Sequence, residues 1–260
     1  MSDANHITSS YNRVSGGYNG RYEQNPLPGV AATLRDLVAQ TGARRVLEVG
    51  CGTGHWLETL APDLNLIVGL DPSTGMLTQA QARPGQIDLV QGRDDALPFA
   101  DGSFDLVYVV NALHHFNDKP GFPAAVKRLL RPGGALALIG HDVPSALGHW
   151  TIYEYFPETI DLDRARYPLW SDVQAWMTAA GYSVQPLRVA EYIRTEYRGR
   201  AILSDHFMQR GGTSQLFLLT DAQYQAGIDR ITRAIEEAES HSQEAIFRTD
   251  IQLYVAVGRV

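Results

Sequence analysis

The stretch Glu48–Gly54, EVGCGTG, decides the fold class, because it places three glycines directly after a short apolar run. The run Val46–Val49 has the length and composition of a buried strand. A chain that gives up side chains at Gly50, Gly52 and Gly54 makes room for a ligand close to its backbone. If a helix follows, its free N–H groups face the same place. The stretch therefore predicts a nucleotide-type binding loop between a strand and a helix.

Outward from this loop, short apolar runs alternate with helical segments. We expect helices at 31–40, 54–60, 73–82 and 122–130, the first ended by Gly42, and strands at 45–49, 64–70, 87–91, 104–110 and 135–140. This alternation is typical of parallel βαβ units. The sequence therefore predicts an α/β fold with a Rossmann-like, doubly wound and mostly parallel sheet.

The regular alternation of apolar runs and helical segments ends after Gly140. The sequence predicts a helix at 171–180 with Ser171 as its N-cap, a strand at 182–190, a helix from Thr220 or Asp221 to about 240, and a last strand at 251–258. Two remaining stretches, at about 141–170 and 191–219, are too long for simple connections. We therefore expect one domain at 31–260 that carries both as helical, aromatic cap insertions.

Residues 1–30 are polar and are interpreted as a loosely ordered arm with one short helical turn. Three tyrosines stand in it, Tyr11, Tyr18 and Tyr22, beside Arg13 and Arg21. Disordered tails rarely carry that many aromatic residues, so we expect the arm to dock. Two interpretations stay open: a lid over the ligand, and packing without ligand contact.

Composition excludes several classes of protein. The chain has 260 residues, 44% of them hydrophobic, and a net charge of −7, which fits a globular protein and argues against a nucleic-acid or anionic-membrane partner. The single cysteine, Cys51, permits neither an internal disulfide nor a cysteine zinc cluster. No secretory signal and no apolar run of about 20 residues are present. A cytoplasmic protein is the expectation.

The glycine spacing discriminates between nucleotide ligands. A dinucleotide loop follows G-x-G-x-x-G, and here the third glycine position is His55. A phosphate loop of the G-x-x-x-x-G-K-[ST] type is absent as well. The spacing therefore disfavours NAD.

The pattern E-x-G-x-G-x-G instead resembles the first motif of the class I S-adenosylmethionine-dependent methyltransferases. Four further stretches match that family in order: GLDPS from Gly69, QGRDDALPF followed by DGSFDLV, NALHHF from Asn111, and LLRPGGALAL from Leu129. Together they cover about residues 44–140. Any one motif alone would be weak, and the ordered set makes the resemblance specific.

The resemblance implies roles for residues that match the motifs. Glu48 would organise the loop or meet the methionine amino group, and the loop of Gly50, Cys51, Gly52 and Gly54 would make room for the methionyl and ribose parts. The other implied cofactor contacts are Asp71 on the ribose hydroxyls, Pro72 or Met76 on the adenine, and Asn111 near the sulfonium.

One position departs from the family. Members often have Asp directly after the glycine of the third motif, where it bonds the adenine amino group. Here that position holds Arg93, and Asp94 comes next. Either Asp94 takes over the adenine contact, or only backbone contacts remain.

Several residues have both a functional and an ordinary interpretation. Cys51 is a small loop residue rather than a nucleophile, and adjacent histidines rarely bind one metal ion, so no metal is expected. Histidines near the carboxyl ends of strands are candidate catalytic bases: His114, His115 and His141. Candidate substrate contacts, which packing could also explain, are Tyr11, Tyr18, Tyr22, Asp142, Trp150 and Tyr153.

The resemblance implies an enzyme that moves the methyl group of S-adenosylmethionine to a small-molecule acceptor by direct displacement, leaving S-adenosylhomocysteine. The aromatic cap favours an apolar or aromatic acceptor. An oxygen or carbon acceptor would need a base, whereas an amine or thiol can react without one. The alternatives are a non-catalytic S-adenosylmethionine-binding protein and, less favoured, an NAD-dependent dehydrogenase. A monomer and a homodimer are both compatible with the sequence.

Overall fold

A computed structural model describes residues 11–12, 15–144 and 148–260. The expectations for residues 1–10, for Arg13 and for residues 145–147 of the first insertion lie outside the described residues. Within the described part, one eight-stranded sheet has the order β3-β2-β1-β4-β5-β8-β6, and β7 also pairs with β8. The strands are β1 (Arg45–Val49), β2 (Leu66–Asp71), β3 (Asp88–Gln91), β4 (Phe104–Val110), β5 (Leu130–His141), β6 (Ser183–Val184), β7 (Arg188–Arg198) and β8 (Ile246–Arg259).

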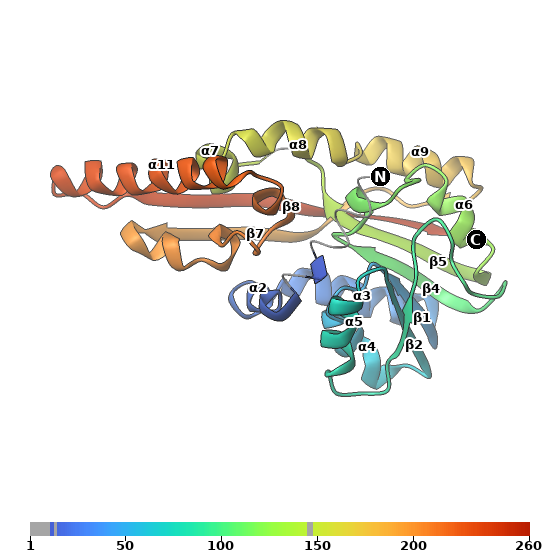
Figure 1. Cartoon of the computed structure of the whole chain (residues 1–260). Coiled ribbons are helices and arrows are strands. Elements are labelled where there is room, and N and C mark those ends of the chain that lie inside the picture. Colours follow the sequence, from blue (N-terminus) through green and yellow to red (C-terminus); the bar gives the residue numbers. More distant parts are fainter. Residues whose placement is uncertain (1–10, 13–14, 145–147) are drawn as a thin grey trace.

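Strands β1 to β5 run parallel, and β8 is antiparallel to β5. Helices cover both faces of this sheet (Figure 1). On one face pack α3 (Pro28–Thr41) and α4 (His55–Leu60). On the other face pack α6 (Phe122–Lys127) and α9 (Trp170–Ala179). The predicted doubly wound α/β fold is therefore confirmed, and α5 (Thr74–Gln81) follows β2 as the alternation requires.

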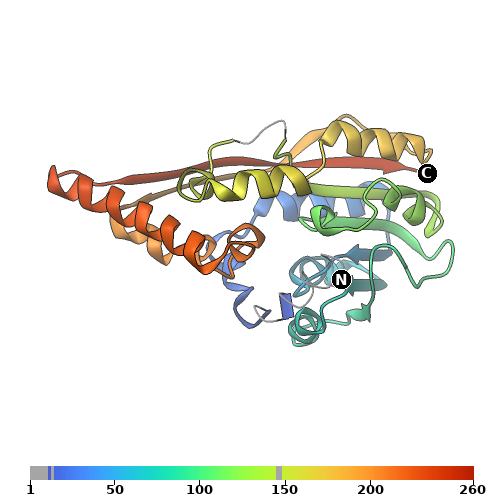
Figure 2. The same cartoon turned by 45° about the horizontal axis from the view of Figure 1, so that its top comes forward.

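A second group of elements extends away from this sheet, and we call it the cap. Its apolar centre includes Ile152, Phe156, Ile231 and Phe247. Figures 1 and 2 both show α11 lying along the extended ends of β7 and β8. The helical elements of the cap are α7 (Thr151–Tyr155), α8 (Glu158–Arg166), η4 (Gly199–Ser204), η5 (His206–Met208), α10 (Ser214–Phe217) and α11 (Asp221–Ser240).

Helix α11 begins as predicted, because Thr220 and Gln223 form a reciprocal capping box at its N-terminus. Several other predicted bounds are wrong. The segment 182–190 does not form one strand but splits between β6 and β7, and 191–198 belongs to β7 rather than to an irregular insertion. Helix α9 begins at Trp170, so Ser171 is not its N-cap. Helix α6 ends at Lys127, before β5 begins at Leu130.

Strand β8 is longer than predicted for a physical reason. Its second half is a buried apolar run, whereas its first half alternates between buried and exposed residues. That first half pairs with β7, which alternates in the same way. The exposed faces of both strands carry ion pairs such as Arg194–Asp250 and Arg248–Glu196. Polar residues therefore mask these strands from a search for apolar runs.

Candidate active site

The glycine loop between β1 and α4 forms a tight turn against β2. The amides of Gly50 and Cys51 both donate to the carbonyl oxygen of Leu70, at 2.7 and 3.1 Å. Gly50 and Gly52 have positive φ angles of 76° and 51°, which glycine adopts without strain. A Cβ on Gly50 would lie 2.5 Å from the Cβ of Ala112, whereas one on Gly52 would meet nothing within 4 Å.

Gly54 has a different role from the one implied for it. Its φ angle is 74°, and it occupies the N-cap position of α4. A Cβ there would lie 3.0 Å from the Cβ of Ala80 on α5. Gly54 is not among the residues that line the pocket described below. Its missing side chain therefore lets α4 approach α5.

Asp71 ends β2 and joins two loops. Its Oδ2 accepts a hydrogen bond from the amide of Gly52 at 2.9 Å, and its Oδ1 accepts one from the amide of Ser73 at 2.8 Å. The residue is 8% exposed. Burial raises the pKa of this carboxyl to about 6, although both amide bonds act to lower it. Each oxygen keeps a lone pair for a ligand.

Glu48 lies deeper, at 1% exposure, on β1. The hydroxyl of Tyr108 donates to its Oε2 at 3.1 Å. Burial raises the pKa of Glu48 well above its ordinary value. A positively charged ligand group near this carboxylate would offset that penalty.

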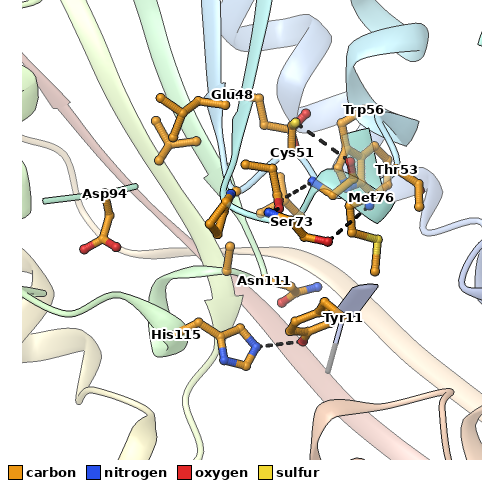
Figure 3. A pocket seen from close by; sticks show the side chains of 18 of the residues that line it. Tyr11, Glu48, Cys51, Thr53, Trp56, Ser73, Met76, Asp94, Asn111 and His115 are labelled. Atoms are coloured by element: carbon orange, nitrogen blue, oxygen red, sulfur yellow. Dashed lines mark hydrogen bonds between the residues drawn. The ribbon is translucent and has the colours of Figure 1, made fainter. Parts of the chain in front are cut away.

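A pocket opens above the loop and contains about 1010 Å³ of space not filled by atoms, part of it open to solvent. Figure 3 labels side chains around it from β1, the glycine loop, α4, α5, the segments that follow β3 and β4, and the N-terminal arm. Most of the sequence-predicted site residues line it: Tyr11, Tyr18, Tyr22, Glu48, Gly50, Cys51, Gly52, Asp71, Pro72, Met76, Asp94, Asn111 and His115. We call it the first pocket.

Asp94 lines the first pocket beside Asn117. Its carboxylate accepts from the backbone amide of Asn117 at 2.9 Å and from the side-chain amide of Asn117 at 3.2 Å. Arg93 also lines the pocket, yet its guanidinium pairs with exposed Asp95. Asp94 is therefore the carboxylate that lines this part of the first pocket, beside Asn117.

The N-terminal arm is tied to both loops of the first pocket. The side-chain oxygen of Asn12 accepts from the hydroxyl of Ser73 at 2.7 Å and from the amide of Gly75 at 2.9 Å. The side-chain oxygen of Asn19 accepts from the hydroxyl of Thr53 at 2.6 Å. In the arm, η1 (Ser15–Gly17) and α2 (Gly20–Gln24) are short helices. The arm therefore docks, as expected from its aromatic residues.

Arg21 in the arm has an unusual environment. Its guanidinium donates to the hydroxyl of Tyr18 at 2.5 Å and lies 4.8 to 5.6 Å from the ring centroids of Tyr18, Tyr22 and Phe207. Among the described residues it forms no ion pair with a carboxylate. A partly buried guanidinium in such surroundings favours an anionic ligand group.

A second pocket adjoins the first and contains about 700 Å³, again including space open to solvent. The two pockets share Tyr11, Tyr18, Arg21 and Asn111. Asn111 follows β4 with a φ angle of 50°, a conformation that costs roughly 1–3 kcal/mol and is often found at functional sites. The second pocket is floored by β7 and β8 and also lined by His114, His141, Trp150, Tyr167, Phe207 and Gln215.

Two of the three predicted histidines lie beside each other at the border of the pockets. The hydroxyl of Tyr11 and Nε2 of His115 are 2.8 Å apart, as the dashed line in Figure 3 marks. The ring of His114 stacks on Tyr167 with centroids 4.1 Å apart. Burial lowers the pKa of His115 to about 3 and the pKa of His114 well below its ordinary value, so both rings are neutral at pH 7.

Of the remaining predicted residues, two line the second pocket and two line neither pocket. His141, at the end of β5, and Trp150 line the second pocket, with ring centroids 6.2 Å apart. Asp142 is buried and lines neither pocket. Tyr153 also lines neither, because its ring packs on Trp150 and its hydroxyl donates to Asp163 at 2.8 Å.

Several residues that line the pockets were not predicted from the sequence. Phe116 and Asn117 directly follow the predicted His115, so the functional segment after β4 extends further than the motif indicates. Thr53 lies within the glycine loop, between Gly52 and Gly54, and Trp56 lies in the first turn of α4. Other missed lining residues come from the cap and carry no local signal: Thr195, Asp205, Phe207, Thr213, Ser214, Gln215 and Thr249.

The described residues contain neither a metal-binding cluster nor a membrane-spanning helix. No group of three or more His, Cys, Asp or Glu side chains in that part of the chain is arranged to hold a metal ion. In the same residues, no helix is both long and apolar enough to cross a bilayer.

Known proteins resemble this chain in sequence. A family model described as a methyltransferase domain matches residues 47–138. An uncharacterized methyltransferase from Synechocystis is 31% identical over 166 residues, which are 63% of this chain and 74% of that protein. A demethylmenaquinone methyltransferase from Renibacterium salmoninarum is 36% identical over 118 residues, which are 45% of this chain and 50% of that protein. This chain thus spans about half the length of the second relative.

Solved structures share the fold. The YcgJ protein from Bacillus subtilis superposes with a TM-score of 0.57 at 23% identity, covering 83% of this chain and 91% of that one. The fold, the glycine loop with its acidic partner on β2, and the sequence matches agree. The chain belongs to the class I S-adenosylmethionine-dependent methyltransferases.

Proposed function

We propose that this methyltransferase binds S-adenosylmethionine in the first pocket and transfers its methyl group to a small, aromatic acceptor in the second. The observation that carries the proposal is the shared wall: Tyr11, Tyr18, Arg21 and Asn111 line both pockets. Two ligands divided by so few side chains can bring their reacting atoms together. Holding the reactants in line and excluding water are the main tasks in a direct displacement.

The charges of the first pocket suit a zwitterionic ligand. S-adenosylmethionine supplies an activated methyl group on a sulfonium sulfur. Arg21 would hold the carboxylate of the methionyl part, and Glu48 would face its ammonium group, so that each buried charge gains a partner. Asp71 would accept from both ribose hydroxyls with its free lone pairs.

The part of the first pocket around Asp94 suits a purine. Asp94, held by Asn117, would accept from the exocyclic amine of adenine. Pro72 and Met76 would pack on the ring from the side of β2. Gly52 would let the ligand approach the backbone, since the place of its Cβ is open.

The second pocket supports a ring-shaped acceptor. Trp150, Tyr167 and Phe207 supply flat apolar walls. The Renibacterium relative is named for a quinone acceptor, demethylmenaquinone, which is consistent with such walls.

A neutral histidine at the shared border can accept a proton. His115 has its Nε2 on Tyr11, and its Nδ1 has no partner among the described residues. A pKa of about 3 makes it a weak base, so we propose that it orients the acceptor and takes a proton only as the acceptor atom becomes acidic in the reaction. His141 is the second candidate base, from the opposite side of the second pocket.

The wider setting is also proposed. We expect the enzyme to act in the cytoplasm, as a monomer or homodimer, on free small molecules rather than nucleic acid. The net charge of −7 supports the last point, because nucleic-acid binding needs a positive surface. The arm at residues 1–30 would act as the lid of a domain at 31–260, with the cap forming the acceptor side.

Calorimetry on the purified chain tests the cofactor assignment first. We expect S-adenosylmethionine and S-adenosylhomocysteine to bind with micromolar affinity and NAD not to bind. Release of S-adenosylhomocysteine with aromatic acceptors then tests transfer, with aliphatic compounds of similar size as the matched set. Preference for NAD would overturn the cofactor assignment. Turnover confined to aliphatic acceptors would overturn the acceptor class alone.

The pKa of Asp71 predicts a pH dependence of cofactor affinity. In the unliganded protein this pKa is raised to about 6 by burial, and ribose hydroxyls donating to the carboxylate favour its ionised form. Binding therefore releases a proton near pH 6. The affinity for S-adenosylhomocysteine should be constant above about pH 7 and fall by up to about tenfold per pH unit below 6. Titrations from pH 5 to 8 check this, and equal affinity at both ends would contradict it.

A further inference from the structure

A third hollow lies on the outer side of both pockets, and we call it the groove. It contains about 800 Å³ not filled by atoms, part of it open to solvent. The groove shares Asn117 with the first pocket and Tyr167 with the second. Tyr167, which stacks on His114, therefore borders both the second pocket and the groove.

The groove is positively charged within an acidic protein. Three cationic side chains line it, namely Lys119, Arg164 and Arg166, against one acid, Asp172. The chain as a whole has a net charge of −7, so this excess is local. A local positive field in a recess raises the concentration of anions there.

Two of these cations form no ion pair among the described residues, although the carboxylate of Asp94 acts to raise the pKa of Lys119 against the effect of burial. Within the described residues, Lys119 and Arg164 form no ion pair, and Lys119 donates only to the carbonyl oxygen of Phe116, at 3.1 Å. Lys119 is partly buried, and burial lowers its pKa. An anion in the groove would restore the lost solvation of this ammonium group.

Arg166 adds a third positive charge beside the groove. Its guanidinium pairs with fully buried Asp163 and donates to the hydroxyl of Ser214 at 3.3 Å, both through one nitrogen. The other two nitrogens, Nε and Nη1, have no partner in the described part of the chain. Both nitrogens are buried rather than exposed in the groove, so Arg166 contributes its positive charge to the groove and not a free pair of donors. Ser214 also lines the second pocket, so Arg166 connects the two spaces.

We infer that the methyl acceptor carries a carboxylate or phosphate group, and that the groove holds this group while the ring lies against Tyr167 in the second pocket. The inference rests on the function proposed for the second pocket, and it goes further by specifying that the acceptor bound there is an anion. Lys119 is two residues from Asn117, which lines both the first pocket and the groove. A free small molecule is favoured because the groove continues from a small-molecule pocket.

Inorganic pyrophosphate is a suitable probe, since it presents the shared anionic chemistry without a ring. We would titrate it into the full chain by calorimetry at low salt, with and without saturating S-adenosylhomocysteine. It should bind the unmodified chain, and about tenfold or more weakly after the double change Lys119→Gln and Arg164→Gln. The matched control, Arg200→Gln with Arg233→Gln, removes two exposed cap charges and should bind as the unmodified chain does.

The outcomes separate the hypotheses. Equal pyrophosphate affinity in both double variants, or no binding to the unmodified chain, would overturn the inference. Sedimentation with phosphatidylglycerol vesicles that is lost in the Lys119 and Arg164 variant would assign the groove to a lipid headgroup and overturn the free acceptor. Failure of S-adenosylhomocysteine to bind the unmodified chain would count against the proposed function instead, because pyrophosphate binding is also measured without it.

Discussion

Replacing Asp71 with alanine should weaken S-adenosylhomocysteine binding by at least about 100-fold. Hydrogen bonds to a charged group contribute about 1.5–3 kcal/mol each, and the carboxylate can accept one from each ribose hydroxyl. The change also releases the amides of Gly52 and Ser73, which Asp71 now holds at 2.9 and 2.8 Å. The glycine loop and the start of α5 would therefore lose their common acceptor.

Asp88→Ala is the matched control for this result. Asp88 is an exposed carboxylate on neighbouring β3, paired in register with Val68, so its loss changes the net charge equally without touching the first pocket. The melting temperatures of both variants should be recorded beside the calorimetry. A folded Asp71→Ala protein that binds within threefold of the unmodified chain would show that the ribose does not meet β2.

Alanine at Gly50 should destabilise the protein, whereas alanine at Gly52 should mainly damage binding. At Gly50 the new Cβ would lie 2.5 Å from the Cβ of Ala112, on a backbone with φ of 76°. Left-handed strain and overpacking together amount to roughly 2–5 kcal/mol. At Gly52 only the strain remains, about 1–2 kcal/mol, because nothing lies within 4 Å of the new Cβ.

Thermal unfolding and calorimetry on the two variants distinguish these effects. At about 2–4 °C per kcal/mol for a chain of this size, Gly50→Ala should melt roughly 4–20 °C lower. Gly52→Ala should lose only a few degrees and yet bind S-adenosylhomocysteine about tenfold more weakly, because its Cβ enters space at the pocket wall. Unchanged affinity in Gly52→Ala would mean that the ligand does not approach this backbone.

The first half of the fold was predictable because its strands are buried on both faces. Strands β1, β2 and β4 read as continuous apolar runs, and β4 has the predicted bounds, Phe104–Val110. In the cap the same reasoning fails. Strand β7 alternates polar and apolar residues over RVAEYIRTEYR, and that alternation identifies a strand only when its partner is known.

The two pockets of the candidate site likewise differ in how far the sequence predicts them. Residues of the first pocket come from local motifs, so the sequence alone suffices to assign Asp71, Gly52 and Asn111 to it. Gly54 is wrongly assigned to the pocket by the same motif, because spacing does not reveal that Ala80 stands in front of its Cα. The second pocket is assembled from segments up to about 240 residues apart, such as Tyr11 and Thr249, and only the tertiary fold brings them together.

Strand β8 belongs to both the main sheet and the cap, so the two fold as a single cooperative unit. Its Val255 and Val257 lie in the core on one face of the sheet, its Ala256 lies in the core on the other face, and its Phe247 lies in the apolar centre of the cap. A subdomain that shares a continuous strand with its neighbour cannot detach as an independently folding module. Exchange of the whole cap would remove β8 from the sheet that supports the cofactor loop. Changes of acceptor preference in this enzyme must therefore arise from substitutions of single side chains on an unchanged backbone.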